Sequence, residues 1–214
     1  MGKKLSGGLM LIILCWALPA VAGLAVDITF DDLATPNDKG TWGIVPEDYQ
    51  GFSWQYIEVV NADAYAKSFG NSKIVFPSRP NAAYNGGPEG GFEVVTLAAN
   101  SPFELEGAYF STWAQKNKLV SYSSRGLTVS GYLKGKAVGS SAINLVPNFV
   151  WHSFDFGPVD LVEFRHTEKD NAHWWLMDNL KVALVPLPAT LALFCLGLIG
   201  LLFFGRRRLP DRIR

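Results

Sequence analysis

The stretch Phe103–Trp113, FELEGAYFSTW, decides the fold class because apolar and charged residues alternate along it. This alternation assigns one face to Phe103, Leu105, Tyr109 and Trp113 and the opposite face to Glu104 and Glu106. A period of two residues is that of a half-buried antiparallel strand. The stretch therefore predicts a strand with one side in a core and the other in solvent.

Nine further segments of the same kind surround this stretch, and spacers rich in Gly, Asn, Pro and Ser separate them. They cover residues 25–31, 51–60, 73–77, 91–98, 126–135, 136–146, 149–156, 159–167 and 173–185. None shows the 3.6-residue apolar period of a helix, and many short strands are typical of an antiparallel β-sandwich or barrel. Lys134-Gly135 sits between two of them and predicts a hairpin turn, because Gly135 can take a positive φ.

Charge and cysteine content restrict the class of protein. The 214 residues carry no formal net charge, but residues 24–185 hold 18 acidic and 12 basic side chains. An acidic body argues against nucleic-acid binding, which needs a clustered basic face. The two cysteines, Cys15 and Cys195, lie in apolar end segments, so the body must be held by its core without disulfides.

The first 22 residues predict a secretory signal peptide. Lys3 and Lys4 precede an apolar stretch, and Ala20-Val21-Ala22 supplies the small residues of a cleavage site before Gly23. A lipoprotein signal ending at Cys15 fits less well because Leu14 before it is large, and an uncleaved anchor helix is the remaining alternative.

Residues 187–204 are uncharged and predict a transmembrane helix, since about 20 apolar residues span a bilayer. A buried core helix is the alternative, but the run is apolar all round. Arginines after it hold that end in the cytoplasm. We thus expect three parts: a signal peptide (1–22), an ectodomain (23–184), and a tail (185–214) with a basic cytoplasmic end (205–214).

The tail resembles the PEP-CTERM sorting domain of Gram-negative bacteria. The matching residues are Val185, Pro186, Pro188, Ala189 and Thr190 before the helix and Arg206, Arg207 and Arg208 after it. The resemblance implies processing by exosortase, a membrane transpeptidase, and delivery through the inner membrane to the cell surface or an exopolysaccharide matrix. Leu187 stands where the motif's central Glu is usual, which leaves open whether the tail is cleaved.

The body resembles a recurring ectodomain of PEP-CTERM proteins. The stretches that carry this resemblance are ITFDDL (28–33), VPEDYQGFSW (45–54), FELEGAYFSTWA (103–114) and WWLMDNLKV (174–182). It implies a jelly roll similar to galactose-binding and carbohydrate-binding modules, with no settled activity.

Each terminal strand carries carboxylates, and alternation places Asp32 and Asp178 on the core side of the first and last strands. Burying an unpaired carboxylate is costly. The first and last strands are often neighbours in jelly rolls, which would bring Asp32 and Asp178 together. Asp31, Asp32, Asp178 and Asn179 could then supply the oxygens that Ca²⁺ prefers. The alternative is that these residues cap strand ends and accept backbone N–H bonds.

Aromatic residues are the other candidates for function, because sugars pack their C–H faces on exposed rings. Trp42 and Tyr49 lie in a Gly/Pro-containing loop region, where binding groups are common. Adjacent Trp174 and Trp175 must point to opposite faces of a strand. We expect these four residues to contact a ligand, and core packing is the alternative for each of them.

No catalytic constellation is evident. The spacings of His152, His166 and His173 match no compact zinc motif, and no G-x-S-x-G elbow occurs. The sequence therefore predicts a non-catalytic exported surface or matrix protein that binds polysaccharide. The alternatives are a structural or adhesive protein acting through protein contacts and an extracellular polysaccharide hydrolase.

Overall fold

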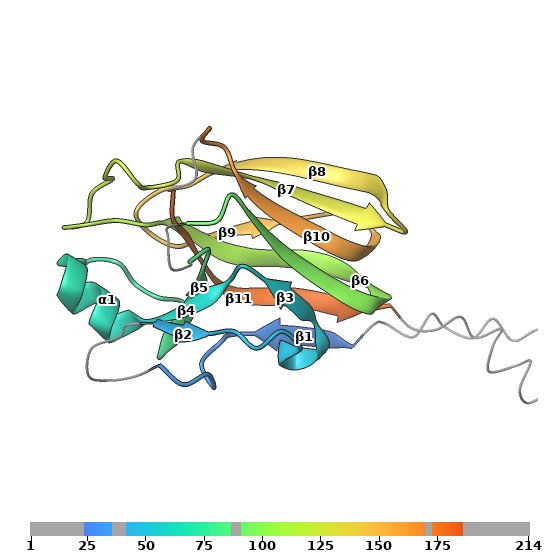
Figure 1. Ribbon diagram of the computed structural model, residues 1–214, viewed down its shortest axis with the longest axis horizontal. Coiled ribbons are helices and arrows are strands. Elements are labelled where there is room, and N and C mark those ends of the chain that lie inside the picture. Colours follow the sequence, from blue (N-terminus) through green and yellow to red (C-terminus); the bar gives the residue numbers. More distant parts are fainter. Residues whose placement is uncertain (1–23, 36–41, 87–90, 170–172, 186–214) are drawn as a thin grey trace, which may run out of the picture.

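The computed structural model describes residues 24–35, 42–86, 91–169 and 173–185. They form strands with one helix and one 3₁₀ turn (Figure 1). The elements in chain order are β1 (Ala25–Ile28), β2 (Trp42–Ile44), η1 (Tyr49–Gly51), β3 (Ser53–Gln55), β4 (Glu58–Asn61), α1 (Ala62–Phe69), β5 (Asn81–Tyr84), β6 (Val94–Thr112), β7 (Gly126–Leu133), β8 (Lys136–Asn144), β9 (Val150–Ser153), β10 (Pro158–His166) and β11 (Trp175–Leu184).

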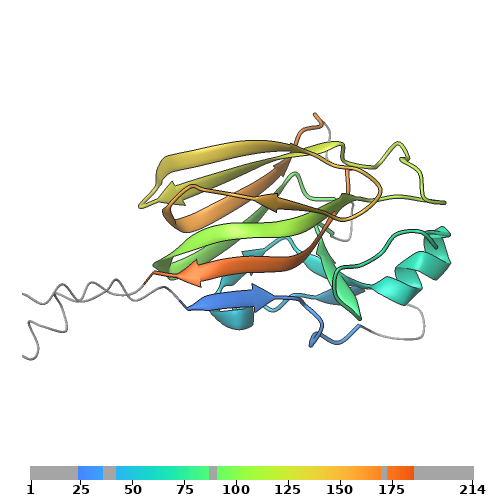
Figure 2. The ribbon, with the colours of Figure 1, turned by 180° about the vertical axis from the view of Figure 1, so that it is seen from behind.

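All the strand pairs among the described residues are antiparallel, which confirms the predicted all-β, antiparallel class. The strands form one sheet in the order β2-β4-β5-β11-β6-β10-β7-β8, with β1 on β11 and both β3 and β9 on β6. Figure 2 shows the first and last strands side by side, and Val26 pairs with Val182. The expectation that the terminal strands are neighbours is therefore correct.

The 19-residue strand β6 joins two halves of this sheet. Its residues 94–98 pair with β3 and β10, and residues 103–112 pair with β11. We call β3, β10, β7, β8 and the first part of β6 the bare half. The covered half consists of β1, β2, β4, β5, β9, β11 and the second part of β6. A strand that passes from one layer to the other is how a sheet folds over into a sandwich.

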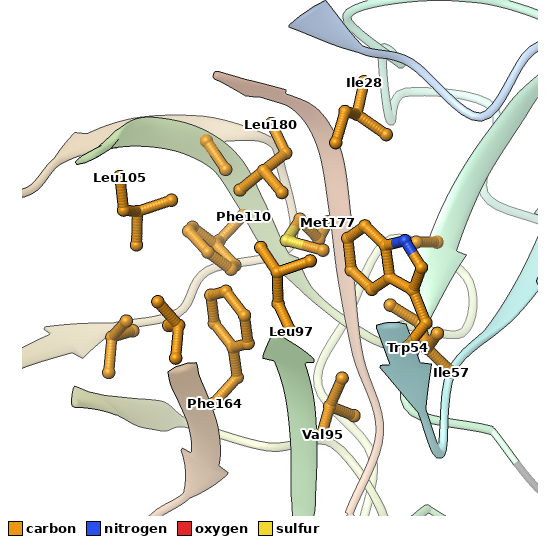
Figure 3. Packing of buried hydrophobic residues seen from close by; sticks show 14 of the residues in the cluster. Ile28, Trp54, Ile57, Val95, Leu97, Leu105, Phe110, Phe164, Met177 and Leu180 are labelled. Carbon is orange, nitrogen blue, oxygen red and sulfur yellow. The ribbon is translucent and has the colours of Figure 1, made fainter. Parts of the chain in front are cut away.

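The inner faces of the two halves enclose the main core, drawn in Figure 3. Phe164 of the bare half lies 6.0 Å, between ring centroids, from both Phe110 and Trp175 of the covered half. Leu97 and Val95 of β6 and Met177 and Leu180 of β11 are buried in the same cluster. At roughly 25 cal/mol per Å² of apolar area buried, this core is the main source of stability.

A second apolar cluster lies on the outside of the covered half. There α1 and residues 71–80 pack over outward-facing side chains of β4, β5 and β11. We call these two segments the cover. The cluster consists of Val60, Ala62, Tyr65, Ile74, Phe76, Ala82, Tyr84, Trp113, Ala114 and Leu176. This part of the covered half is therefore buried on both faces.

The helix α1 was not predicted. Asn61 caps it by accepting bonds from the N–H groups of Asp63 and Ala64, and Gly70 ends it with φ 68°. Eight residues are too few for a clear apolar period, but an Asn and a Gly at the two ends are helix signals. The predicted strand 73–77 is also wrong, since these residues form an irregular part of the cover.

Other strand predictions differ from the structure in detail. The segments 91–98 and 103–113 belong to one strand, β6, and β2 and β5 were not expected. The Lys134-Gly135 turn is confirmed, with φ of 51° and 73°.

The predicted face of Tyr109 and Trp113 is also wrong. Pairing with β11 shifts between Gly107 and Leu105, so the alternation changes within β6. Phe103 and Leu105 stay in the main core, whereas Trp113 enters the outer cluster.

Candidate functional site

The outer face of the bare half consists of polar and small side chains, and no described segment covers it. One row of paired residues crosses this face from strand to strand, with one residue from each of β3, β6, β10, β7 and β8. In that order the residues are Gln55, Thr96, Glu163, Ser130 and Ser140. The Oγ atoms of Ser130 and Ser140 are 3.0 Å apart. We call this surface the bare face.

Two tyrosines, Tyr56 and Tyr132, form the two ends of a line of contacts across the bare face. Tyr56 packs on Phe92, with ring centroids 4.6 Å apart. The next residue, Glu93, pairs with Arg165, whose Nη2 lies 4.0 Å from Glu163. Glu163 accepts a 3.1 Å hydrogen bond from the hydroxyl of Tyr132. We call this line of contacts from Tyr56 to Tyr132 the stripe.

Tyr56 owes its position to its backbone conformation. In a regular strand it would share the inner face with Trp54, two residues before it. Its φ of 62° ends β3 there, so Ile57 is buried and Tyr56 is 55% exposed. An aromatic residue in the left-handed region is strained, and such strain is typical of functional positions. No periodicity in the sequence signals this exception.

The stripe offers a ligand aromatic rings as well as hydrogen-bonding groups. Strands β3 and β7 are three strand intervals apart, or about 14 Å, so the two tyrosines can contact separate units of an extended ligand. Between them Arg165 donates and Glu93 and Glu163 accept hydrogen bonds. The hydrogen bond to Glu163 raises the pKa of Tyr132, so its hydroxyl remains a neutral donor.

Two of the four predicted contact residues are buried in the main core. Trp175 is 0% exposed, and Tyr49 packs on Phe30 while its hydroxyl donates to Asp32. As predicted, Trp174 and Trp175 point to opposite faces, because Trp174 packs against the outer cluster.

The other two predicted contact residues, Trp42 and Trp174, are half-buried on the covered half. Both rings contact Trp113, at centroid distances of 5.6 Å and 5.3 Å. None of the four residues belongs to the stripe, so their role as ligand contacts stays a prediction.

The predicted calcium ligands are only partly brought together. Asp178 is buried, and its carboxylate accepts bonds from the N–H and hydroxyl of Ser78 and from the N–H of Asn179. Asp31 lies close enough to repel it and accepts a bond from the N–H of Asn81. Asp32 is exposed and accepts a bond from Tyr49, so its predicted place on the core side is wrong.

Asp178 also faces the opposite way from the prediction. Asn179 has φ 47°, and the pairing with β6 shifts between Asp178 and Lys181, so an extra residue reverses the alternation. Leu180 then faces the main core, while Asp178 faces Ser78 in the cover. Burial raises the pKa of Asp178 to about 6, and the nearby Asp31 adds to the shift.

These contacts resemble the predicted alternative, in which the carboxylates accept backbone N–H bonds. One feature favours a cation: the buried Oδ1 of Asn179 accepts no hydrogen bond within the described part of the chain. Residues 24–35, 42–86, 91–169 and 173–185 contain no group of three His, Cys, Asp or Glu arranged to hold a metal. The calcium site stays a prediction.

Two of the three histidines, His166 and His173, lie beside each other, whereas His152 lies on a different strand. His166 is buried near Glu168, with its Nδ1 3.5 Å from the carboxylate, and its ring lies 5.7 Å from that of His173. His152 lies on β9 beside Phe110.

The predicted signal peptide, the helix 187–204 and the sorting residues after Val185 lie outside the described residues. Within the described ranges, none of the helical structure has the length and apolar character needed to cross a membrane. The N–H of Val185 donates to the carbonyl of Pro102 at the end of the body.

Comparison with known families identifies the tail. Residues 184–208 match the model of the PEP-CTERM protein-sorting motif. This motif indicates an exported protein that exosortase sorts to the cell surface. No curated protein matches the chain.

Several solved structures show a distant likeness. A mutant of CBM29-2, a family 29 carbohydrate binding module, has 16% identity and a TM-score of 0.36 over 74% of this chain and 90% of its own. A cleaved adhesin domain of Lys-gingipain from Porphyromonas gingivalis has 16% identity and a TM-score of 0.39 over 76% and 99%. GH31 CBM32-2 bound to GalNAc has 13% identity and a TM-score of 0.32 over 59% and 76%. At these TM-scores, neither a common fold nor a ligand follows for this chain, and the predicted jelly roll stays a prediction.

Proposed function

We propose that this protein is a non-catalytic component of the cell surface or extracellular matrix that binds polysaccharide through the stripe on the bare face. The observation that carries the proposal is Tyr56, an aromatic residue that is 55% exposed in a left-handed backbone conformation. A ring held outward at the expense of backbone strain is better explained by ligand contact than by folding.

The chemistry of the stripe supports a sugar ligand. Tyr56 and Tyr132 present rings for the apolar faces of pyranoses, and Glu93, Arg165 and Glu163 lie between them. A polysaccharide presents hydroxyls that both donate and accept hydrogen bonds, so it matches a surface with both kinds of group. The open sheet face suits a chain that extends beyond the site at both ends.

The PEP-CTERM motif at residues 184–208 supports the location. We propose that the body is exported, held at first by the C-terminal helix in the inner membrane, and then delivered to the surface by exosortase. Such a protein meets exopolysaccharide where it acts. Calcium, if it binds near Asp178, has a structural role, because that position lies under the cover and away from the bare face.

The test is binding of the full chain, in mild detergent, to a panel of purified bacterial exopolysaccharides by affinity electrophoresis. We expect Tyr132→Ala and Tyr56→Ala each to weaken binding about tenfold or more, as loss of a central aromatic contact does. The matched control is Tyr109→Ala, which removes a half-buried tyrosine that packs on Trp151 at 5.2 Å on the covered half.

Two further measurements on the same protein distinguish the two alternatives. Partner capture that is independent of sugar would favour the adhesive protein, and release of reducing ends from a bound polysaccharide would favour the hydrolase. Retention of full affinity in both stripe variants, or binding to no polysaccharide in the panel, would refute the proposal.

A further inference from the structure

The sheet has one long edge among several short ones. The other edge strands of the two halves, β1, β2, β3 and β9, have three or four residues each. The strand β8 has nine residues and ends the strand order beside β7 (Figure 1). An edge strand directs unpaired N–H and C=O groups outward, and proteins normally keep such edges short or charged.

The strand β8 has little of this protection. Eight of its nine residues are exposed or half-exposed, and among the described strands it pairs with β7 alone. Its one charged residue is Lys136, at the turn, and it contains no proline. The pairing with β7 shifts at Val138, which is 44% exposed, but Gly139–Asn144 pair with β7 in regular register. These six residues form an open, uncharged edge.

We propose that β8 pairs antiparallel with β8 of a second copy of this chain, so that two bare halves form one continuous sheet. A two-fold axis at Ser141 places Ser141 opposite its own copy and Ser140 opposite Ala142, with no like charges in contact. Opposed serines form cross-strand hydrogen bonds, as Ser130 and Ser140 already do within one chain. The two Lys136 side chains lie at opposite ends of the paired strands.

This arrangement has a consequence that rests on the proposed function. Cross-strand partners in an antiparallel pair point to the same side of a sheet, so the bare faces of both copies lie on one side. Two stripes then face the same polysaccharide, and the second binding event becomes intramolecular. The contact buries little area, so we expect a reversible dimer whose amount rises with protein concentration.

Disulfide trapping tests the pairing, because the body contains no cysteine. In the full chain with Cys15→Ser and Cys195→Ser, one cysteine is placed at Ser140, Ser141 or Ala142. We expect mild oxidation to give a covalent dimer for at least one of these variants. The matched control is Ser130→Cys, in the same row but one strand further in. Its two copies would lie about 14 Å apart, beyond the reach of a disulfide.

A second variant tests the same interface without cysteine. Ser140→Lys with Ala142→Lys places like charges across the two-fold axis, and we expect the dimer seen by light scattering to become monomeric. Binding of that monomer to a short oligosaccharide should remain, whereas binding to the long polysaccharide should weaken. A wild-type chain that stays monomeric at tens of micromolar, or equal cross-linking at Ser130, would overturn the pairing. Either result would leave the proposed sugar site intact.

Discussion

The outer faces of the two halves are built on the same kind of antiparallel strand, but one is buried and the other is bare. On the covered half, Tyr84, Trp113 and Leu176 point outward and pack beneath α1. On the bare half, the corresponding positions hold Thr96, Glu163 and Ser130, and no described segment packs on them. The side chains that face outward, rather than the strands, therefore decide which face is available to a ligand.

Polar contacts fix the cover in place. The hydroxyl of Tyr65 accepts a bond from the N–H of Ala114 and donates to its carbonyl, at 2.8 Å and 3.2 Å. The side chain of Asn71 donates to the same carbonyl. Buried groups of this kind must be paired, because an unpaired one costs about 1–3 kcal/mol. The cover is thus part of the folded body, whereas the bare face has no counterpart to it.

The largest difference between the two faces should appear when one aromatic residue is removed from each. Trp113 is 1% exposed and its ring contacts those of Trp42, Tyr65, Phe69, Tyr84 and Trp174. We expect Trp113→Ala to lower the free energy of unfolding by about 3–5 kcal/mol, because it leaves a large cavity. Urea unfolding of the full chain measures this change.

The control for that variant is Tyr132→Ala on the bare face. A surface substitution usually changes stability by about 0.5 kcal/mol or less, and here the lost bond to Glu163 adds little because both groups reach solvent. A similar loss of unfolding free energy in Trp113→Ala and Tyr132→Ala would mean that the bare face is also covered. The two outer faces would then not differ in the way described.

The next largest effect is a pH dependence of stability that arises in the covered half, because Asp178 lies under the cover. Its pKa is about 6 in the folded protein, against an ordinary value of 3.8. The folded state therefore holds a proton that the unfolded state releases. The stability from protonated Asp178 is fully present below about pH 3.8 and is lost as the pH rises through 6. The change is on the order of 2–3 kcal/mol.

Thermal unfolding between pH 4 and pH 7 measures this effect, and Asp178→Asn should flatten the decline while keeping the bond from Ser78. Calcium gives the opposite sign, since a cation needs deprotonated carboxylates and would stabilise the fold more as pH rises. A midpoint unaffected by chelator at pH 7 would count against calcium. A stability that falls on acidification to pH 4 in the presence of chelator would contradict the raised pKa.

Only a small effect on stability is expected at Tyr56, which, like Tyr132, lies on the bare face. Asparagine tolerates the left-handed conformation better than tyrosine, so Tyr56→Asn relieves strain while losing the contact with Phe92, worth about 0.5–1.5 kcal/mol. We expect a net change in unfolding free energy within about 1 kcal/mol and a loss of polysaccharide binding. Tyr109→Asn should show the reverse, with lower stability and unchanged binding. A large destabilisation by Tyr56→Asn would identify Tyr56 as a structural residue.

Much of the architecture could be predicted from local patterns. Alternation of apolar and polar residues indicated an antiparallel fold, and the turn at Lys134-Gly135 and the opposite faces of Trp174 and Trp175 are confirmed. Each of these depends on residues close together in the chain. The pairing of the first and last strands is also correct, although it rested on what is usual in jelly rolls.

The candidate site could not be predicted in the same way. Alternation follows a strand only while the backbone stays extended, and one residue with positive φ reverses it. Asn179 turns Asp178 toward the cover, and Tyr56 turns its own ring outward. Tryptophan content suggested binding residues, but in this fold the rings of Trp42, Trp174 and Trp175 mainly pack against other aromatic rings.

The sequence by itself determined the strand-rich body and the sorting motif, because both depend on residues close together in the chain. The body shows a two-residue period, and the motif is confined to a 25-residue tail. Only the tertiary structure decided which outer face is buried. That choice depends on where α1 and residues 71–80 pack, far along the chain from Trp113 and Leu176. Burial is a property of neighbours in space, so the bare face emerges only once the chain has folded.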